Sequence, residues 1–218
     1  MANKKPAPKA ARKVSPAKLW IEGARLRTLP LAIAPVLIGW GAAASVQSFK
    51  LGLALLALAV ALFLQIGVNY ANDYSDGVRG TDEFRVGPLR LTGSKSVRPE
   101  LVKYAAFAFF GLAALAGLAI VLITGFWWLL AVGAVAIVAA WFYTGGKNPY
   151  GYAGLGEIAV FLFFGLVATM GTAYIQLGYF DANSLFGGAA IGLFASAVLM
   201  INNIRDIDQD VLAGKRTL

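Results

Sequence analysis

The sequence contains no cysteine and no histidine among its 218 residues. These absences exclude disulfides, thiolate nucleophiles, zinc sites of the usual Cys/His kind and a histidine general base. Charged residues are also scarce, at 14% of the chain. The chemistry of this protein is therefore left to carboxylates, lysine, arginine, tyrosine and amides.

Hydrophobic residues make up 59% of the chain and the mean hydropathy is +0.69, above the roughly 45–50% apolar content of soluble domains. A membrane-spanning helix needs about 20 apolar residues. Six stretches meet that need, and none alternates as a barrel strand would. The sequence therefore predicts an all-α polytopic membrane helical bundle with spans near Leu29–Val46, Leu51–Ala71, Tyr104–Ile123, Phe126–Tyr143, Glu157–Gly178 and Ser184–Asn203. Thr124 and Gly125 predict a tight hairpin between the third and fourth spans.

The basic residues lie almost entirely on one side of this arrangement. Of 19 Lys and Arg residues, 18 fall on one side and only Lys50 on the other. The positive-inside tendency predicts that the crowded side, with both termini, faces the cytoplasm from a cell (plasma) membrane. The basic segment 1–18 is expected to be a disordered cytoplasmic tail that sets topology, not one that binds nucleic acid. Residues 19–218 form the predicted membrane domain.

Two aspartate-bearing segments lie where apolar spans run out, NDYSDGVRGTD at 72–82 and NNIRDIDQD at 202–210. Four crossings separate them, so both are predicted to emerge on the same face and to meet in one cavity. Asp73 and Asp76 have i,i+3 spacing, and Asn202, Asp206 and Asp210 have i,i+4,i+8 spacing, so each set is expected to line one side of a helix.

Carboxylates this close repel one another unless a cation neutralises them. With oxygen ligands alone, the sequence favours Mg²⁺, which usually takes one or two carboxylates together with phosphate oxygens. A lone Asp or Asn after a helix often only caps it, but two matched clusters favour a metal–diphosphate site. The predicted metal ligands are Asp73, Asp76, Asp206 and Asp210, with Asn72 and Asn202 as supporting polar groups.

Neighbouring loops supply positive charge. Arginines and lysines alternate with glycines after the second span, at Arg79, Arg85, Arg90, Lys95 and Arg98. The segment YTGGKNPYGYAGLGE at 143–157 contains one lysine, and GKRTL follows the second aspartate segment. The positive-inside tendency alone also predicts basic cytoplasmic loops. Each of these residues is therefore consistent with two roles, binding of phosphate or setting of the topology. The candidate diphosphate contacts are Arg90, Lys147, Lys215 and Arg216.

Taken together, these motifs resemble the UbiA superfamily of intramembrane prenyltransferases. That family has N-D-x-x-D-x-x-x-D and D-x-x-x-D motifs, which Asn72, Asp73 and Asp76, and Asp206 with Asp210, match. Gly80 stands where the third aspartate of the first motif is expected, and Asp82 follows two residues later. This ending, together with 80–94, 143–157 and 202–218, is similar to the branch acting on 1,4-dihydroxy-2-naphthoate.

The resemblance implies a function. Mg²⁺ would bridge the diphosphate of a polyprenyl donor, and an allylic cation would be attacked by the naphthoate at its carboxyl-bearing carbon, with loss of carbon dioxide, giving demethylmenaquinone. It further implies that Tyr143 stabilises the cation or touches the aromatic acceptor and that Asp82 contributes to substrate binding. The family has nine spanning helices and six are visible here, so we expect that the C-terminal helices are missing from this chain.

Three alternatives remain open. The acceptor could be another aromatic compound, such as 4-hydroxybenzoate or homogentisate, or a haem or chlorophyll precursor. From a different class, a cation-coupled transporter would also use intramembrane acids, although its sites usually lie near the bilayer midplane. A structural scaffold would be insensitive to loss of the aspartates. Prenyl chain length and oligomeric state are not predicted.

Overall fold

A computed structural model of the chain describes residues 15–82 and 90–217. This part of the chain is helical, with one isolated bridge between Ala153 and Arg216, and it confirms the predicted all-α bundle. The elements are α1 (Pro16–Gly23), η1 (Leu26–Thr28), α2 (Leu29–Ser45), α3 (Leu51–Arg79), α4 (Pro99–Thr124), α5 (Leu129–Phe142), η2 (Tyr150–Tyr152), α6 (Gly156–Val160), η3 (Phe161–Val167), α7 (Ala168–Leu177), α8 (Ala182–Arg205) and α9 (Ile207–Leu212).

Five helical stretches of the described residues are long and apolar enough to cross a membrane. They are Pro16–Ser45, Leu51–Arg79, Pro99–Thr124, Gly156–Leu177 and Ala182–Arg205. The predicted fourth span, Phe126–Tyr143, is shorter than expected, because α5 begins only at Leu129 after a turn in which Leu129 N–H donates to Phe126 O. The predicted hairpin before it is present, since Gly125 ends α4 with a left-handed backbone (φ 75°).

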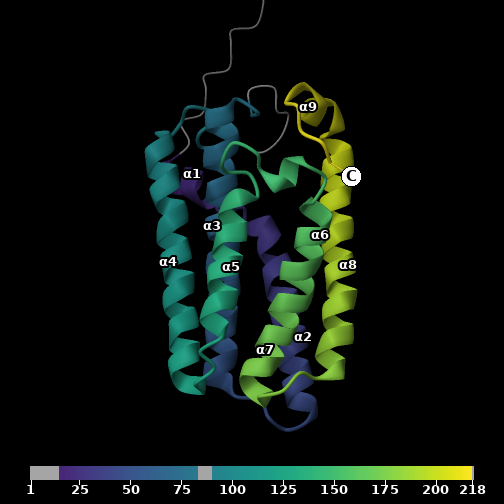
Figure 1. Cartoon of the computed structure of the whole chain (residues 1–218). Coiled ribbons are helices and arrows are strands. Elements are labelled where there is room, and N and C mark those ends of the chain that lie inside the picture. Colours follow the sequence, from purple (N-terminus) through teal and green to yellow (C-terminus); the bar gives the residue numbers. More distant parts are fainter. Residues whose placement is uncertain (1–14, 83–89, 218) are drawn as a thin grey trace, which may run out of the picture.

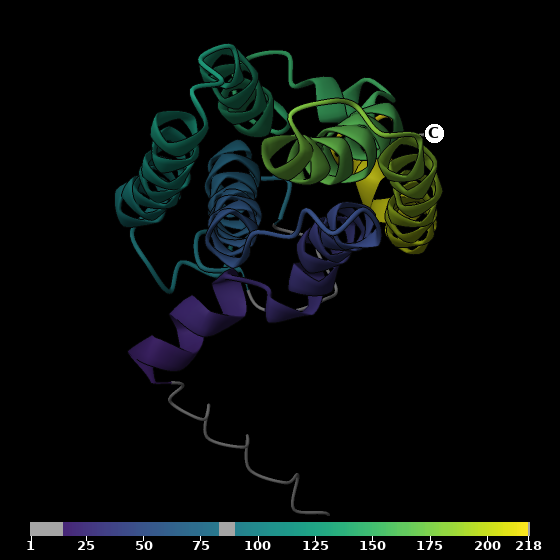
Figure 2. The same ribbon diagram turned by 90° about the horizontal axis from the view of Figure 1, so that it is seen from below.

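The long helices run side by side, as Figures 1 and 2 show from two directions. Helix α3 packs along α4, where Phe110 lies against Gly67 and a Cβ at that glycine would come within 2.7 Å of the ring. The fifth membrane stretch contains a π-helical segment, η3. It packs closely on α8, because Gly165 has no side chain to separate it from Gly188 and Gly192. Large apolar side chains on the outer faces stay exposed, as expected against lipid.

The ends of α3 and α8 differ from the sequence expectation. Helix α3 continues to Arg79, past the predicted span end at Ala71, so Asp73 and Asp76 lie on one helix, as their i,i+3 spacing predicted. Helix α8 stops at Arg205, and Asp206 lies between α8 and α9. The prediction that Asn202, Asp206 and Asp210 share one helical side is therefore wrong. Asn202 belongs to α8 and Asp210 to α9, and Asp206 at the junction donates from N–H to Asn202 O at 3.1 Å and accepts from Asp210 N–H at 2.9 Å.

The N-terminal region is helical from Pro16, inside the segment 1–18 that was predicted to be a tail. Residues 1–14 of that tail and Arg85 of the basic loop lie outside the described residues. Ser15 caps α1, and its hydroxyl accepts from Lys18 N–H. The C-terminal end of α3 and helix α9 lie at the same end of the bundle (Figure 1).

Candidate active site

A cavity of about 1300 Å³ opens among the long helices. Its walls come from α2, α3, α4, α5, the α6–η3–α7 stretch and α8. Eight of the twelve predicted site residues line it, which are Asn72, Asp73, Asp76, Arg90, Tyr143, Asn202, Asp206 and Lys215. The other four, Asp82, Lys147, Asp210 and Arg216, are not among the lining residues. Residues from both aspartate segments therefore lie on one cavity.

Asp73 is fully buried. Its carboxylate binds the backbone of Leu91 and Thr92, which follow the loop after α3. Its Oδ2 accepts a hydrogen bond from Leu91 N–H at 2.9 Å and its Oδ1 accepts one from Thr92 N–H at 2.8 Å. Gly77 allows this approach, because a Cβ there would lie 2.5 Å from the Thr92 side chain. In this structure the carboxylate of Asp73 fixes residues 90–93 against α3.

Arg90 begins this fixed segment and lines the cavity. Its side chain is 9% exposed, and its Nε lies 3.7 Å from Asp82 Oδ1. Its Nη1 is buried without a hydrogen-bond partner among the described residues. Gly80 ends α3 with φ 82°, a left-handed conformation that glycine adopts more readily than aspartate. A glycine therefore suits position 80, and the next acid of this segment is Asp82.

Asp76 is joined to the loop between α5 and α6. Tyr152 donates from its hydroxyl to Asp76 Oδ1 at 2.7 Å, and the same hydroxyl lies 3.1 Å from Thr81 Oγ1. The Arg79 guanidinium lies 4.8 Å from the centre of the Tyr152 ring. Burial, followed by the charge of Asp76, raises the pKa of Tyr152. The phenol therefore remains a protonated donor.

The second aspartate segment reaches the same loop. Lys215 Nζ lies 3.0 Å from Asp210 Oδ2 and 5.8 Å from the centre of the Tyr152 ring. The backbone of Arg216 pairs with the loop on both sides, donating to Tyr152 O and accepting from Gly154 N–H, each at 3.0 Å. Asp206 accepts two hydrogen bonds from the Arg205 side chain, at 2.7 and 2.9 Å. Tyr152 thus connects the two acidic segments.

The remaining predicted residues are placed as follows. Asn72 Oδ1 accepts from the Thr144 hydroxyl at 2.8 Å, which ties α3 to the start of the α5–α6 loop. Tyr143 lines the cavity, and its ring meets Tyr150 edge-on with centres 5.5 Å apart. Lys147 is exposed on the loop. Asn202 is half-buried on the cavity wall.

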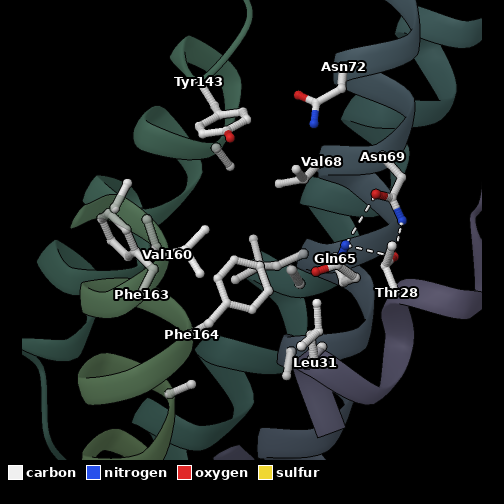
Figure 3. Close-up of a pocket in the computed structure, with 18 of the residues that line it drawn as sticks. Thr28, Leu31, Gln65, Val68, Asn69, Asn72, Tyr143, Val160, Phe163 and Phe164 are labelled. Carbon is white, nitrogen blue, oxygen red and sulfur yellow. Dashed lines mark hydrogen bonds between the residues drawn. The ribbon is translucent and has the colours of Figure 1, made fainter. Parts of the chain in front are cut away.

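Two polar groups were not among the predicted site residues. Gln65 and Asn69 line the cavity beside Thr28, deeper along α3 than Asn72 (Figure 3). Glu157 is buried and accepts from Asn203 Nδ2 at 2.6 Å. The sequence does carry a signal for Gln65 and Asn69. Together with Asn72 and Asp76 they interrupt an apolar helix at spacings that put all four on one face.

The donor set can be compared with what Mg²⁺ requires. No group of three or more acidic side chains suited to a metal is found within the described residues. Asp76 and Asp206 both line the cavity, where Asp76 accepts from Tyr152 and Asp206 accepts from Arg205. The Asp73 carboxylate accepts two backbone N–H groups, and Asp210 is paired with Lys215 outside the cavity lining. Two carboxylates with diphosphate oxygens match the usual Mg²⁺ pattern, so the residues fit an ion that arrives with its phosphate ligands.

Comparison with known proteins gives a consistent result. Residues 32–218 match the UbiA prenyltransferase family. A protein of Mycobacterium tuberculosis, 1,4-dihydroxy-2-naphthoate octaprenyltransferase, is 56% identical over 91% of this chain and 68% of its own length. Proteins of the same name are 41% identical in Escherichia coli, over 94% of this chain and 68% of the relative, and 32% identical in Bacillus subtilis, over 89% and 62%.

Proposed function

The chain belongs to the UbiA prenyltransferase family, and we propose that it transfers a polyprenyl group from an allylic diphosphate to 1,4-dihydroxy-2-naphthoate in menaquinone biosynthesis. It is a multi-pass membrane protein and an aromatic prenyltransferase. The acceptor is inferred from relatives of that name, which are 56% and 41% identical to this chain.

One observation supports this proposal most strongly. One cavity is lined by acidic groups of both aspartate segments, by the nearby Arg90 and Lys215 and by apolar side chains of the long helices. A polyprenyl diphosphate has the same division, with a charged head and a long hydrocarbon tail. We infer that the head lies near Asp76, Asp206, Arg90 and Lys215 and that the tail extends along the apolar walls.

The chemistry follows from this placement. The allylic C–O bond breaks, and its electron pair leaves with the diphosphate. The ring of the acceptor then forms a C–C bond at its carboxyl-bearing carbon. The bond from that carbon to the carboxylate breaks and releases carbon dioxide, and the electron pair restores the aromatic ring. The product is the prenylated quinol, whose oxidised form is demethylmenaquinone.

The protein's own residues make this reaction possible by charge and by exclusion of water. Arg90 and Lys215 face negative charge that grows on the leaving group, and such electrostatic stabilisation is strong in a site shielded from water. The apolar walls keep water from the cation. Tyr143, on the same cavity, offers a ring face that stabilises positive charge. A Mg²⁺ ion held by Asp76 and Asp206 with the diphosphate would neutralise the charge of the leaving group.

The same proposal sets the orientation of the protein. The aspartate segments lie at the end of the bundle that also holds α1 and α9 (Figure 1). Because 18 of the 19 basic residues belong to that side of the predicted arrangement, we infer that the cavity opens to the cytoplasm from the plasma membrane.

The direct test uses membranes containing this protein. They are incubated with Mg²⁺, a polyprenyl diphosphate and 1,4-dihydroxy-2-naphthoate carrying a labelled carboxyl group. We expect a prenylated quinol and one labelled carbon dioxide per product. Product with 4-hydroxybenzoate, and none with the naphthoate, would contradict the proposed acceptor. Prenylated naphthoate that keeps its label would contradict the decarboxylating step.

A further inference from the structure

Two buried residues, Gln65 and Asn69, and the half-buried Thr28 form a hydrogen-bonded group on the cavity wall, which we call the amide cluster. Gln65 Nε2 donates to Thr28 Oγ1 at 3.0 Å and to Asn69 Oδ1 at 3.1 Å. Asn69 Nδ2 donates to Thr28 Oγ1 at 3.0 Å and to Ala24 O at 2.8 Å. All three residues line the cavity (Figure 3).

The backbone fixes the direction of every hydrogen bond in the amide cluster. Ala24 O can only accept, so the Asn69 amide must present its NH₂ group to it and its oxygen to Gln65. The Thr28 hydroxyl gives its one proton to Arg25 O at 2.9 Å, so it can only accept from the two amides. Gln65 must therefore turn its own NH₂ group toward Thr28 and Asn69. Neither amide can be flipped without two acceptors facing one another.

One group is left over from this arrangement. All four amide hydrogens of the cluster are used, and Gln65 Oε1 is buried with no hydrogen-bond partner among the described residues. The Gln65 side chain belongs to a residue that is only 7% exposed. A buried carbonyl without a donor is unfavourable, because folding has removed its water without a replacement. The amide cluster thus offers one acceptor and no donor.

The surroundings indicate what kind of group could supply the donor. Gln65 lies seven residues before Asn72 on the same face of α3, which is a rise of about 10 Å. Figure 3 shows Phe163, Phe164 and Val160 on the wall that faces Gln65 across the cavity. The π-helical segment η3 brings the two adjacent Phe residues to that wall. A flat apolar ring with a hydroxyl group fits this setting, whereas a carboxylate or a carbonyl would meet only another acceptor.

We propose that Gln65 Oε1 accepts a hydrogen bond from a hydroxyl of the aromatic acceptor and so selects for it. The inference rests on the proposed function, in which the reacting carbon lies near the diphosphate at the Asp76 end. The acceptor's carboxylate is then drawn toward Arg90, and the hydroxyl farther from the carboxylate, at carbon 4, extends toward Gln65. The amide cluster is the subsite that reads this hydroxyl.

The test compares two ligands. 1,4-Dihydroxy-2-naphthoate is the substrate, and 1-hydroxy-2-naphthoate lacks only the carbon-4 hydroxyl. Inhibition of the wild-type reaction by the second compound gives its binding constant whether or not it is prenylated. We expect the wild type to bind it about tenfold more weakly than the substrate, the effect of about one neutral hydrogen bond. Equal binding by the wild-type protein would overturn the proposal without any variant.

Gln65→Leu provides the second half of the test. It removes the acceptor at similar volume, so the two compounds should bind equally well, while the KM for the polyprenyl diphosphate stays unchanged. Gln176→Leu is the matched control. Gln176 is also a buried, doubly hydrogen-bonded glutamine, accepting from Lys50 N–H and donating to Thr172 O, but it is outside the lining of the large cavity. That variant should keep the tenfold preference even if its stability falls.

The possible results separate the two proposals. If the wild type prenylates the naphthoate and Gln65→Leu keeps the preference, Gln65 Oε1 pairs with water or with nothing, and the subsite is wrong. If the wild type gives no product with the naphthoate but does with another aromatic acid, the proposed acceptor is wrong. A loss of polyprenyl diphosphate affinity in Gln65→Leu would assign the amide cluster to the donor and overturn the inference.

Discussion

The Tyr152 hydroxyl and Asp76 Oδ1 are joined by a hydrogen bond of 2.7 Å that links helix α3 to the loop after α5. The same tyrosine ring lies under Lys215, which is paired with Asp210. A single side chain thus connects two acidic segments that are more than 120 residues apart in the sequence. We therefore expect substitutions at Tyr152 to lower the rate of prenyl transfer, although this residue lies on a loop.

Tyr152→Phe should lower kcat/KM by about tenfold to a hundredfold. The reason is that a hydrogen bond to a charged group contributes about 1.5–3 kcal/mol, and Asp76 would lose its fixed orientation. The measurement is the rate of prenylated product in membranes at equal protein levels. Tyr150→Phe is the matched control, because that hydroxyl donates to Ala139 O and not to a carboxylate. Equal rates for both variants would show that the Asp76 contact has no role in turnover.

Asp73→Asn should destabilise the protein by about 1–3 kcal/mol, since an amide presents NH₂ to one of the two backbone N–H groups that the carboxylate now accepts. Asp76→Asn, which keeps an oxygen for Tyr152, should lower activity with little loss of stability. Thermal unfolding in detergent, measured beside product formation, separates the two effects. Unchanged stability of Asp73→Asn would mean that residues 90–93 are held by other contacts.

Removal of divalent cations should stop prenyl transfer. Asp76 and Asp206 both line the cavity, and in the proposed function these two carboxylates and a diphosphate would hold Mg²⁺. EDTA should abolish product formation, and added Mg²⁺ should restore it. Full turnover in the presence of chelator would exclude the metal-bridged diphosphate and leave neutralisation to the basic residues.

Tyrosine ionisation should weaken the fold at alkaline pH. Burial raises the pKa of Tyr150 from 10.0 to about 12. A raised pKa means that the protonated form is favoured in the folded state, so the stabilisation is complete below pH 10.0 and is lost as the pH rises toward about 12. Unfolding temperature should therefore fall more steeply over this range in wild type than in Tyr150→Phe. If the unfolding temperatures of wild type and Tyr150→Phe fall equally with pH, the Tyr150 hydroxyl is in contact with solvent.

Gly165→Ala should disrupt the packing of η3 on α8. A Cβ at this position would lie 2.6 Å from Gly188 O and from Gly192 Cα, both backbone atoms that cannot turn aside. Gly111→Ala is the control, because no atom lies within 4 Å of its added Cβ, and it should raise stability by about 0.4–1 kcal/mol. We expect a lower unfolding temperature for the first variant only. A lower unfolding temperature for Gly111→Ala alone would mean that η3 and α8 can move apart without loss of stability.

The sequence predicted the features that depend on local composition. Apolar length predicted the spanning helices, and counting four crossings predicted that Asp76 and Asp206 lie at the same end. It did not predict where side chains find partners. The partners of Asp73 come from a segment that folds back 18 and 19 residues later. The break at Asp206 could not be inferred from i,i+4 spacing, which continues through it. Gln65 shares a helical face with Asn69 and Asn72, but the sequence does not show that its partners leave Oε1 without a donor.

The polar face of α3 also bears on how the protein is made. Gln65, Asn69, Asn72 and Asp73 follow one side of a helix that must enter the bilayer, where unpaired amides and carboxylates are costly. Their partners arrive from both directions, from Ala24 and Thr28 before the helix and from Leu91, Thr92 and Thr144 after it. We therefore expect α3 to settle in lipid only when its neighbours are synthesised, so that the first helices integrate as a group and not one by one.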